Sequence, residues 1–287
     1  MREAFSPVEL DFQLPSGRLH AQRFGSESAP LAVCVPGLSA NMKSFDFLGE
    51  RLGGPSLQLV AVDLRGRGKS DVTPPGTCGW DSHARDVLAV ADALGAARLS
   101  VIGHSMGALV ALAAARLDSA RLERLVLIDA CGYPDESTGP LISAAVARLG
   151  SVYPSVEVYL EGVKQIGTVS PWSDYFERYL RYELVPTEGG VRARSSRDAV
   201  LEDAAEFEPG HQDVYGLWRH VQQPVLLLRA ARELLPGGGF VVSASDRDRF
   251  AREVRSARVV EIDANHYGII TAEATAAAIA GFFASTR

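Results

Sequence analysis

The chain has few cysteines, and their pattern does not form a disulfide framework. Its 287 residues include Cys34, Cys78 and Cys131, an odd number of widely spaced thiols with no C-x-x-C pair. We therefore expect reduced thiols in a cytoplasmic protein, with Cys34 and Cys131 packed as small apolar side chains beside strands.

Basic runs and long apolar runs are also missing. No run of lysine and arginine exceeds a dipeptide, and the formal net charge is −6. Both facts argue against a basic surface that binds nucleic acid. No stretch reaches membrane-spanning length, the first residues lack the apolar core of a signal peptide, and no amphipathic anchor is visible. We expect no nucleic-acid or membrane partner, and the sequence does not indicate an oligomeric state.

What the chain does have is a regular alternation of strand and helix patterns. At 47% hydrophobic and 22% charged residues, it is large enough for one α/β core plus an inserted subdomain. Helical patterns cover residues 81–94, 108–117 and 271–283. Strand patterns cover residues 8–12, 18–24, 31–35, 57–62, 99–102, 125–129, 224–228 and 258–262. The first two strands read as an antiparallel hairpin, and the repeated strand–helix–strand units predict a largely parallel, doubly wound α/β sheet.

The most informative motif is Gly103-His104-Ser105-Met106-Gly107, between an apolar strand pattern and an alanine-rich helix pattern. G-x-S-x-G in that context is typical of a nucleophile elbow, in which Ser105 sits on a tight, strained turn. Glycines two residues to either side remove the Cβ atoms that would collide there. The following helix N-terminus directs backbone N–H groups toward a developing oxyanion.

Residues 133–222 break the alternation and read as several helices separated by prolines and glycines. Seven of the eight tyrosines fall between Tyr133 and Tyr215. Most of these aromatics suit the core of a helical subdomain. The segment follows a strand whose carboxyl end lies on the same sheet edge as Ser105, so we interpret it as a cap over the site. Trp172, Tyr175 and Tyr159 are the residues we expect to bind substrate there.

Three further motifs carry a family resemblance: Val35-Pro36-Gly37-Leu38, residues 63–70 and Asn265-His266-Tyr267-Gly268. Together with the serine motif and the order of elements, they resemble the α/β-hydrolase superfamily over nearly the whole chain outside its middle third. The resemblance implies an α/β-hydrolase fold, with a core of residues 1–132 and 223–287, a helical cap at 133–222, and serine chemistry.

A serine hydroxyl needs a base to take its proton. Of the six histidines, His266 alone follows the last strand pattern, where the family places its base. His104 adjoins Ser105 but is expected to be structural. The resemblance also implies an oxyanion hole formed by the backbone N–H groups of Met106 and Leu38. Many relatives have His-Gly where this chain has Pro36-Gly37, but donation by the backbone does not need the missing side chain.

The acid that would orient His266 has two candidates. Glu233 follows the strand pattern at 224–228, the commoner family location, but its glycine-rich surroundings look mobile. Asp129 ends the strand after the elbow helix, as the acid does in some family members, and a strand end holds a carboxylate more rigidly. We favour Asp129.

A Ser–His–acid set with an oxyanion hole transfers an acyl group to water. The first hypothesis is a cofactor-free, metal-independent hydrolase of a carboxylic ester or lactone of a small to medium acyl compound. The same parts serve thioester, linear amide and carbon–carbon hydrolases and cofactor-free haloperoxidases, and a non-catalytic ligand receptor is a further alternative. Arginines between residues 148 and 194 are candidates for binding a substrate carboxylate, although surface solvation explains most of them.

Overall fold

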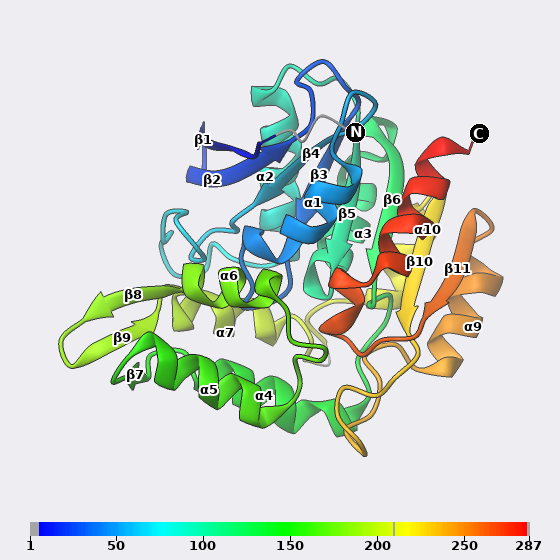
Figure 1. Cartoon of the computed structure of the whole chain (residues 1–287). Coiled ribbons are helices and arrows are strands. Elements are labelled where there is room, and N and C mark those ends of the chain that lie inside the picture. Colours follow the sequence, from blue (N-terminus) through cyan, green and yellow to red (C-terminus); the bar gives the residue numbers. More distant parts are fainter. Residues whose placement is uncertain (1–5, 209, 286–287) are drawn as a thin grey trace.

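The computed structural model describes residues 6–208 and 210–285, in which one large mixed sheet carries helices on both faces (Figure 1). Its strand order is β1-β2-β4-β3-β5-β6-β10-β11. The strands are β1 (Val8–Leu14), β2 (Gly17–Phe24), β3 (Leu31–Val35), β4 (Gln58–Val62), β5 (Leu99–His104), β6 (Leu122–Ile128), β10 (Val225–Ala230) and β11 (Ala257–Ile262). β2 is antiparallel to both β1 and β4, and the pairs from β4 to β11 are parallel. The predicted hairpin and parallel, doubly wound sheet are confirmed.

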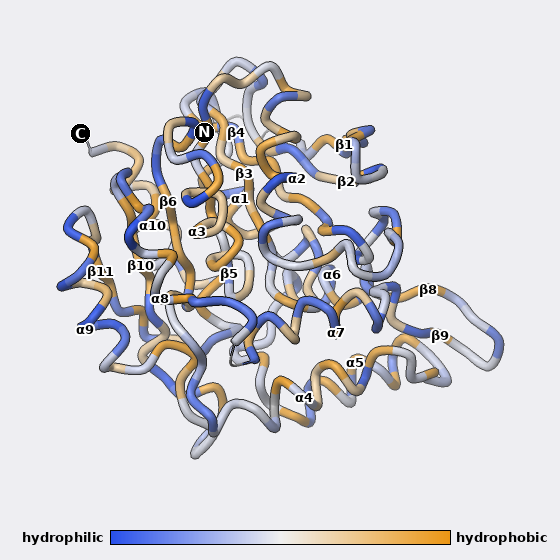
Figure 2. Tube along the Cα trace, turned by 180° about the vertical axis from the view of Figure 1, so that it is seen from behind, coloured by the Kyte–Doolittle hydropathy of each residue, from blue (hydrophilic) through white to orange (hydrophobic). Residues whose placement is uncertain are grey.

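Two apolar layers cover the sheet. α2 (Trp80–Ala93), α3 (Met106–Asp118) and α9 (Ala244–Glu253) pack on one face, and α1 (Asp46–Leu52) and α10 (Glu273–Ala284) on the other. Figure 2 shows that the central strands and α3 are mostly apolar, whereas α9 is largely hydrophilic. α3 packs on the same face as α2 and has ten consecutive buried residues. None of the described helices is long and apolar enough to cross a membrane.

Two of the three thiols lie inside this core. Cys34 in β3 and Cys131 after β6 are fully buried and free, as expected for small apolar side chains. Burial raises the pKa of both thiols, which keeps them protonated and unreactive.

Residues 133–222 are called the insertion below, and most of their described part lies across the carboxyl ends of the strands (Figure 1). They contain α4 (Gly139–Ala147), α5 (Val156–Ile166), α6 (Asp174–Glu183), α7 (Arg197–Ala205) and α8 (Val214–Leu217). The insertion also has a three-stranded antiparallel sheet, β7 (Val152–Tyr153), β9 (Gly190–Ala193) and β8 (Leu184–Thr187), where only helices were expected. Its turn requires glycine, because a Cβ on Gly190 would lie 2.0 Å from the Tyr153 carbonyl oxygen. The sequence pattern alone predicts these glycines only as breaks between helices.

The end of the insertion packs on the core. Val214, Leu217 and Trp218 are buried in the same apolar cluster as α3. The Trp218 indole N–H donates to the Cys131 carbonyl oxygen at 2.7 Å. The part of the insertion that lies over the strand ends is therefore shorter than residues 133–222.

Candidate active site

Ser105 occupies the strained turn between β5 and α3. Its backbone has φ 56° and ψ −126°, and the only other described non-glycine residue with positive φ is Asp129. A Cβ on Gly103 would lie 2.1 Å from the Gly107 carbonyl oxygen, and one on Gly107 would lie 2.0 Å from the Val35 carbonyl oxygen. Both glycines are thus required for β5, α3 and the β3 end to meet. The turn presents the Ser105 hydroxyl at the strand ends.

The loop after β3 passes directly beside Ser105. A Cβ on Gly37 would lie 3.2 Å from the Ser105 Cβ atom, so a larger residue there would crowd the hydroxyl. Leu38 follows, and both Leu38 and Met106 line the cavity at Ser105. Met106 is the first residue of α3, where backbone N–H groups have no partner within the helix. The two residues are suitably located to donate to an oxyanion on a carbonyl attacked by Ser105.

His266 and Asp129 form a buried pair from two loops at the strand ends. The Nδ1–H of His266 donates to Asp129 Oδ2 at 2.8 Å, leaving Nε2 free to accept a proton. The other carboxylate oxygen accepts the Ala230 N–H at 2.9 Å, which fixes the Asp129 side chain. Glu233 instead accepts the N–H of Gly237 within its own loop. The structure brings Asp129, and not Glu233, to His266.

His104 contacts the His266 side of this pair. Its Nε2–H donates to the His266 carbonyl oxygen at 2.9 Å, and the two imidazole centroids are 4.7 Å apart. Burial, with the neighbouring His266 as a smaller cause, lowers the pKa of His104 to about 3. The lowered pKa keeps His104 neutral at neutral pH.

A cavity of about 130 Å³ opens at Ser105 and is walled mostly by apolar side chains of both the core and the insertion. Its apolar and aromatic wall includes Ile142, Val146, Phe176, Tyr179, Phe207, Val241 and Tyr267. A second cavity of about 240 Å³ is lined mostly by the insertion, with Leu234 and Tyr267 of the core. The two cavities share Ala145, Arg148, Tyr179, Leu234 and Tyr267.

Arg148 is the one lysine or arginine among the described residues that line either cavity. Its Nη1 donates to the Tyr159 hydroxyl at 2.5 Å and to the carboxylate of Glu183. Glu183 is 1% exposed, and its Oε2 has no hydrogen-bond partner among the described residues. Arg148 therefore lies between two mostly apolar spaces, beside a carboxylate that has one oxygen without a partner in the described part of the chain.

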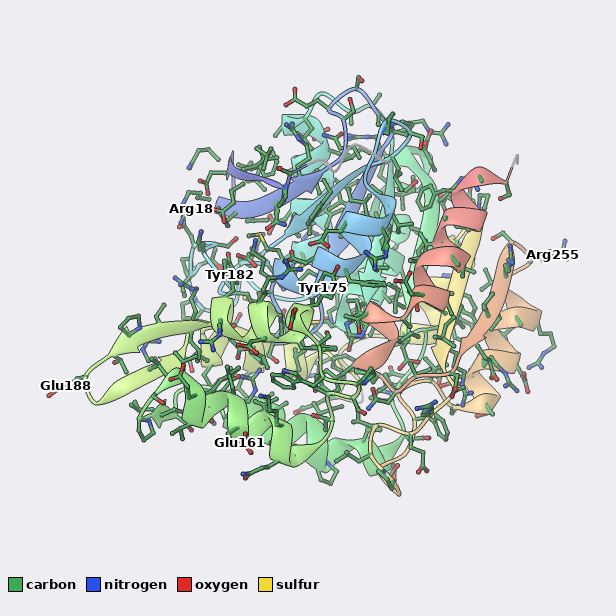
Figure 3. The ribbon with its side chains drawn as sticks, viewed as in Figure 1. Arg18, Glu161, Tyr175, Tyr182, Glu188 and Arg255 are labelled. Carbon is green, nitrogen blue, oxygen red and sulfur yellow. The ribbon has the colours of Figure 1, made fainter. Side chains whose placement is uncertain are left out.

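The aromatic residues predicted to bind substrate are mostly elsewhere. Trp172 and Tyr175 are not among the residues lining the first cavity, and Tyr159 lines only the second. Tyr175, labelled in Figure 3, lies where α6 meets the core and donates to Glu50 at 2.6 Å. On α6 the residues that line the first cavity are Phe176 and Tyr179, three residues apart on one face of the helix. Substrate binding by Trp172, Tyr175 and Tyr159 stays a prediction.

Within the described ranges 6–208 and 210–285, no group of three or more histidine, cysteine or acidic side chains is arranged to hold a metal ion.

Sequence comparison decides the family. The model described as "Alpha/beta hydrolase family" matches residues 32–278. The chain belongs to the alpha/beta hydrolase family. This membership agrees with the fold and with the strained serine turn.

Two curated relatives of this hydrolase have named activities. It is 32% identical over 219 residues, 75% of each chain, to N-formylmaleamate deformylase of Pseudomonas putida. It is 27% identical over 260 residues to 2-(acetamidomethylene)succinate hydrolase of Mesorhizobium japonicum, covering 89% of this chain and 88% of the relative. A crystal structure of E-2-(acetamidomethylene)succinate hydrolase superposes with a TM-score of 0.85 at 24% identity, covering 98% of this chain and all of the other. At that identity the structural likeness concerns the fold.

Proposed function

We propose that this protein is a cofactor-free serine hydrolase in which Ser105, His266 and Asp129 form the catalytic triad. The observation that carries the proposal is the 2.8 Å contact from His266 Nδ1 to Asp129, with Ser105 on the strained turn in the same cavity. A serine, a base with a free nitrogen and an orienting carboxylate are the parts that acyl transfer needs.

The reaction has two halves. Ser105 Oγ attacks the substrate carbonyl carbon while His266 takes the hydroxyl proton, and the carbonyl oxygen becomes an oxyanion held by the Leu38 and Met106 N–H groups. The intermediate collapses, the leaving group takes the proton from His266, and an acyl-enzyme remains. Water then gives a proton to His266 and attacks the acyl carbon, which releases the carboxylic acid and restores Ser105.

The scissile bond that we favour is an acyclic amide. The sequence alone favours an ester or lactone and leaves the amide as an alternative. The names of the two curated relatives denote a deformylase of an N-formyl compound and a hydrolase of an acetamido compound. Both names also denote carboxylates, and Arg148 supplies a cation at the cavity wall. We therefore infer a small N-acyl amide that bears a carboxylate. An ester or lactone of similar size is the second candidate, since the apolar cavity and the triad suit it equally.

A substrate panel tests the choice of bond. One acyl group is presented as an amide, an alkyl ester and a lactone, each with and without a carboxylate, and every rate is divided by the uncatalysed rate. We expect the largest acceleration for the carboxylate-bearing amide. A larger acceleration for the ester or lactone would reverse the order of the two candidates. Ser105→Ala should abolish turnover of all of them, and retained activity would contradict the serine mechanism itself.

A further inference from the structure

The loop between β4 and α2 carries a charged motif, residues 63–70, that the proposed reaction does not use. Asp63 and Arg67 are both fully buried there, and Arg65 is 7% exposed. Buried charges are costly unless they are paired and hydrogen-bonded. Their partners show which part of the molecule the motif supports.

Arg67 holds the loop that contains Leu38. Its Nε and Nη2 donate to the Leu38 carbonyl oxygen at 3.1 and 2.8 Å, and its Nη1 donates to the Arg65 carbonyl oxygen at 2.9 Å. The Leu38 carbonyl and the Leu38 N–H belong to adjacent peptide units joined at one Cα atom. Fixing the carbonyl therefore restrains the direction in which the N–H points.

The guanidinium of Arg67 is itself held by the insertion. Its Nη2 also donates to Asp203 on α7, and both side chains are fully buried. Asp203 further accepts the Gly79 N–H at 2.6 Å and the Nε2–H of His83 at 2.8 Å. Burial opposes ionisation of Asp203, but His83 and Arg67 outweigh it and lower the pKa of this carboxyl. Asp203 stays charged and bonded to Arg67.

A second contact restrains the far end of the same loop. Asp63 accepts the Met42 N–H at 2.8 Å and the Lys69 N–H at 2.9 Å. The hydroxyl of Tyr182 on α6 donates to Asp63 at 2.5 Å, and Figure 3 labels Tyr182 where α6 meets the core. The loop from Leu38 to Met42 is thus held at both ends by buried polar side chains of the core, Arg67 and Asp63. Each of those groups has one partner in the insertion.

We infer that Arg67 is a positioning residue for the oxyanion hole, and that the insertion completes the hole by supplying Asp203. The inference rests on the proposed function, because it needs the Leu38 N–H to be an oxyanion donor. Donors at such a site act only when they are aimed at the oxygen in the transition state. A small displacement therefore lowers kcat while substrate binding is retained.

Arg67→Lys is the main test, with Arg65→Lys as the matched control. A lysine at 67 keeps a positive charge beside Asp203 but cannot bond Asp203, the Leu38 carbonyl and the Arg65 carbonyl together. Arg65 is a neighbour in the same loop that forms a buried ion pair with Asp86 and has no bond to Leu38. We expect Arg67→Lys to lower kcat about ten- to hundredfold, less than the loss of a whole donor. KM should stay within about threefold, whereas Arg65→Lys should leave kcat within about threefold.

Two inhibitors separate positioning from general structural damage. A trifluoromethyl ketone forms a tetrahedral oxyanion adduct with Ser105, whereas the product carboxylate binds without one. Arg67→Lys should weaken the ketone by the same factor as kcat and leave the affinity for the product unchanged. Asp203→Asn, which is isosteric and keeps an acceptor for Gly79, should shift kcat and ketone affinity in the same direction by a smaller factor.

The outcomes are distinguishable. If Arg67→Lys matches Arg65→Lys in kcat and ketone affinity, Arg67 is only structural and the inference is overturned. If Arg67→Lys behaves as expected but Asp203→Asn is silent, the part assigned to the insertion is wrong. Ser105→Ala is measured in parallel, and full activity in that variant would overturn the proposed function instead.

Discussion

Two buried carboxylates, Asp129 of the core and Glu183 of the insertion, are held differently. In the core, one oxygen of Asp129 accepts the Ala230 N–H and the other faces His266. In the insertion, Glu183 is equally buried, but one of its oxygens has no partner among the described residues. A buried acceptor left unbonded costs free energy. Asp129 is therefore fully bonded, whereas Glu183, beside Arg148, keeps one oxygen without a partner among the described residues.

This difference suggests a division of tasks. The groups proposed to break the bond come from core loops and are fixed by backbone contacts, so they need no ligand to be in place. The cavity at Ser105 is walled by both parts, and the insertion contributes the one arginine among its described lining residues, Arg148, which is paired with Glu183. Substitutions in the core should then reduce kcat, and substitutions at the cavity wall should change KM.

The largest effect is expected at the proposed nucleophile and base. Ser105→Ala and His266→Ala should each lower kcat by about 10⁴-fold or more and by nearly the same factor, because the two act as one unit. A sulfonyl fluoride should label Ser105 alone, as mass spectrometry of the digested protein would show. Ser245→Ala on α9 is the control and should keep full activity. Very unequal losses at Ser105 and His266 would show that they do not act together.

The acid assignment gives the next effect. Asp129→Asn should lower kcat by about a hundredfold or more, because an amide cannot stabilise the imidazolium or fix its tautomer. Glu233→Gln should change kcat by less than about tenfold, since its carboxylate is bonded within its own loop. Rates are measured beside thermal unfolding, so that misfolding is not mistaken for catalysis. If Glu233→Gln lowers kcat strongly while Asp129→Asn hardly changes it, the acid is Glu233.

The core could be predicted from sequence because its determinants are local. The glycines around Ser105 are required by backbone atoms within a few residues or on the next strand, and the strands are short apolar runs. The preference for Asp129 over Glu233 used the rigidity of a strand end. The geometry at His266 agrees with that preference, while the role of Asp129 stays a prediction.

The insertion could be predicted only coarsely. α6 contacts the core on one side and the cavity on another, and both surfaces carry aromatic side chains. Helical spacing alone therefore could not tell Tyr175 from Tyr179 as the cavity residue. Arg67 and Asp203 are 136 residues apart, and a buried ion pair of that separation leaves no local pattern. The family motif at 63–70 was visible, but its partner on α7 was not.

A smaller effect, on KM, tests whether Arg148 of the insertion binds a substrate carboxylate. Arg148→Met combined with Glu183→Gln removes the cation without leaving a buried charge unpaired. KM for a carboxylate-bearing amide should rise about ten- to hundredfold, the usual value of a charge-assisted hydrogen bond, with kcat little changed.

Two comparisons sharpen that result. KM for the methyl ester of the same carboxylate should move by less than about threefold. Arg181→Met, an exposed arginine on α6, should change neither value. Equal increases in KM for the charged and the esterified compound would mean that Arg148 shapes the cavity and does not bind a carboxylate.

The smallest expected effect is a change at His104 in how the free energy of unfolding depends on pH. Its pKa is about 3 in the folded protein against 6.5 ordinarily, because burial disfavours the charged ring. As the pH falls below 6.5 the unfolded chain takes up a proton that the folded chain excludes, so stability is lost on the way down to pH 3. The slope for one proton is at most ~1.4 kcal/mol per pH unit. His104→Gln, which can still donate to the His266 carbonyl, should flatten the slope of unfolding free energy between pH 6.5 and 5. His211→Gln on the exposed surface is the control, and denaturant titrations at several pH values give the slopes. If His104→Gln keeps the slope of the unchanged protein, His104 is not held neutral beside His266.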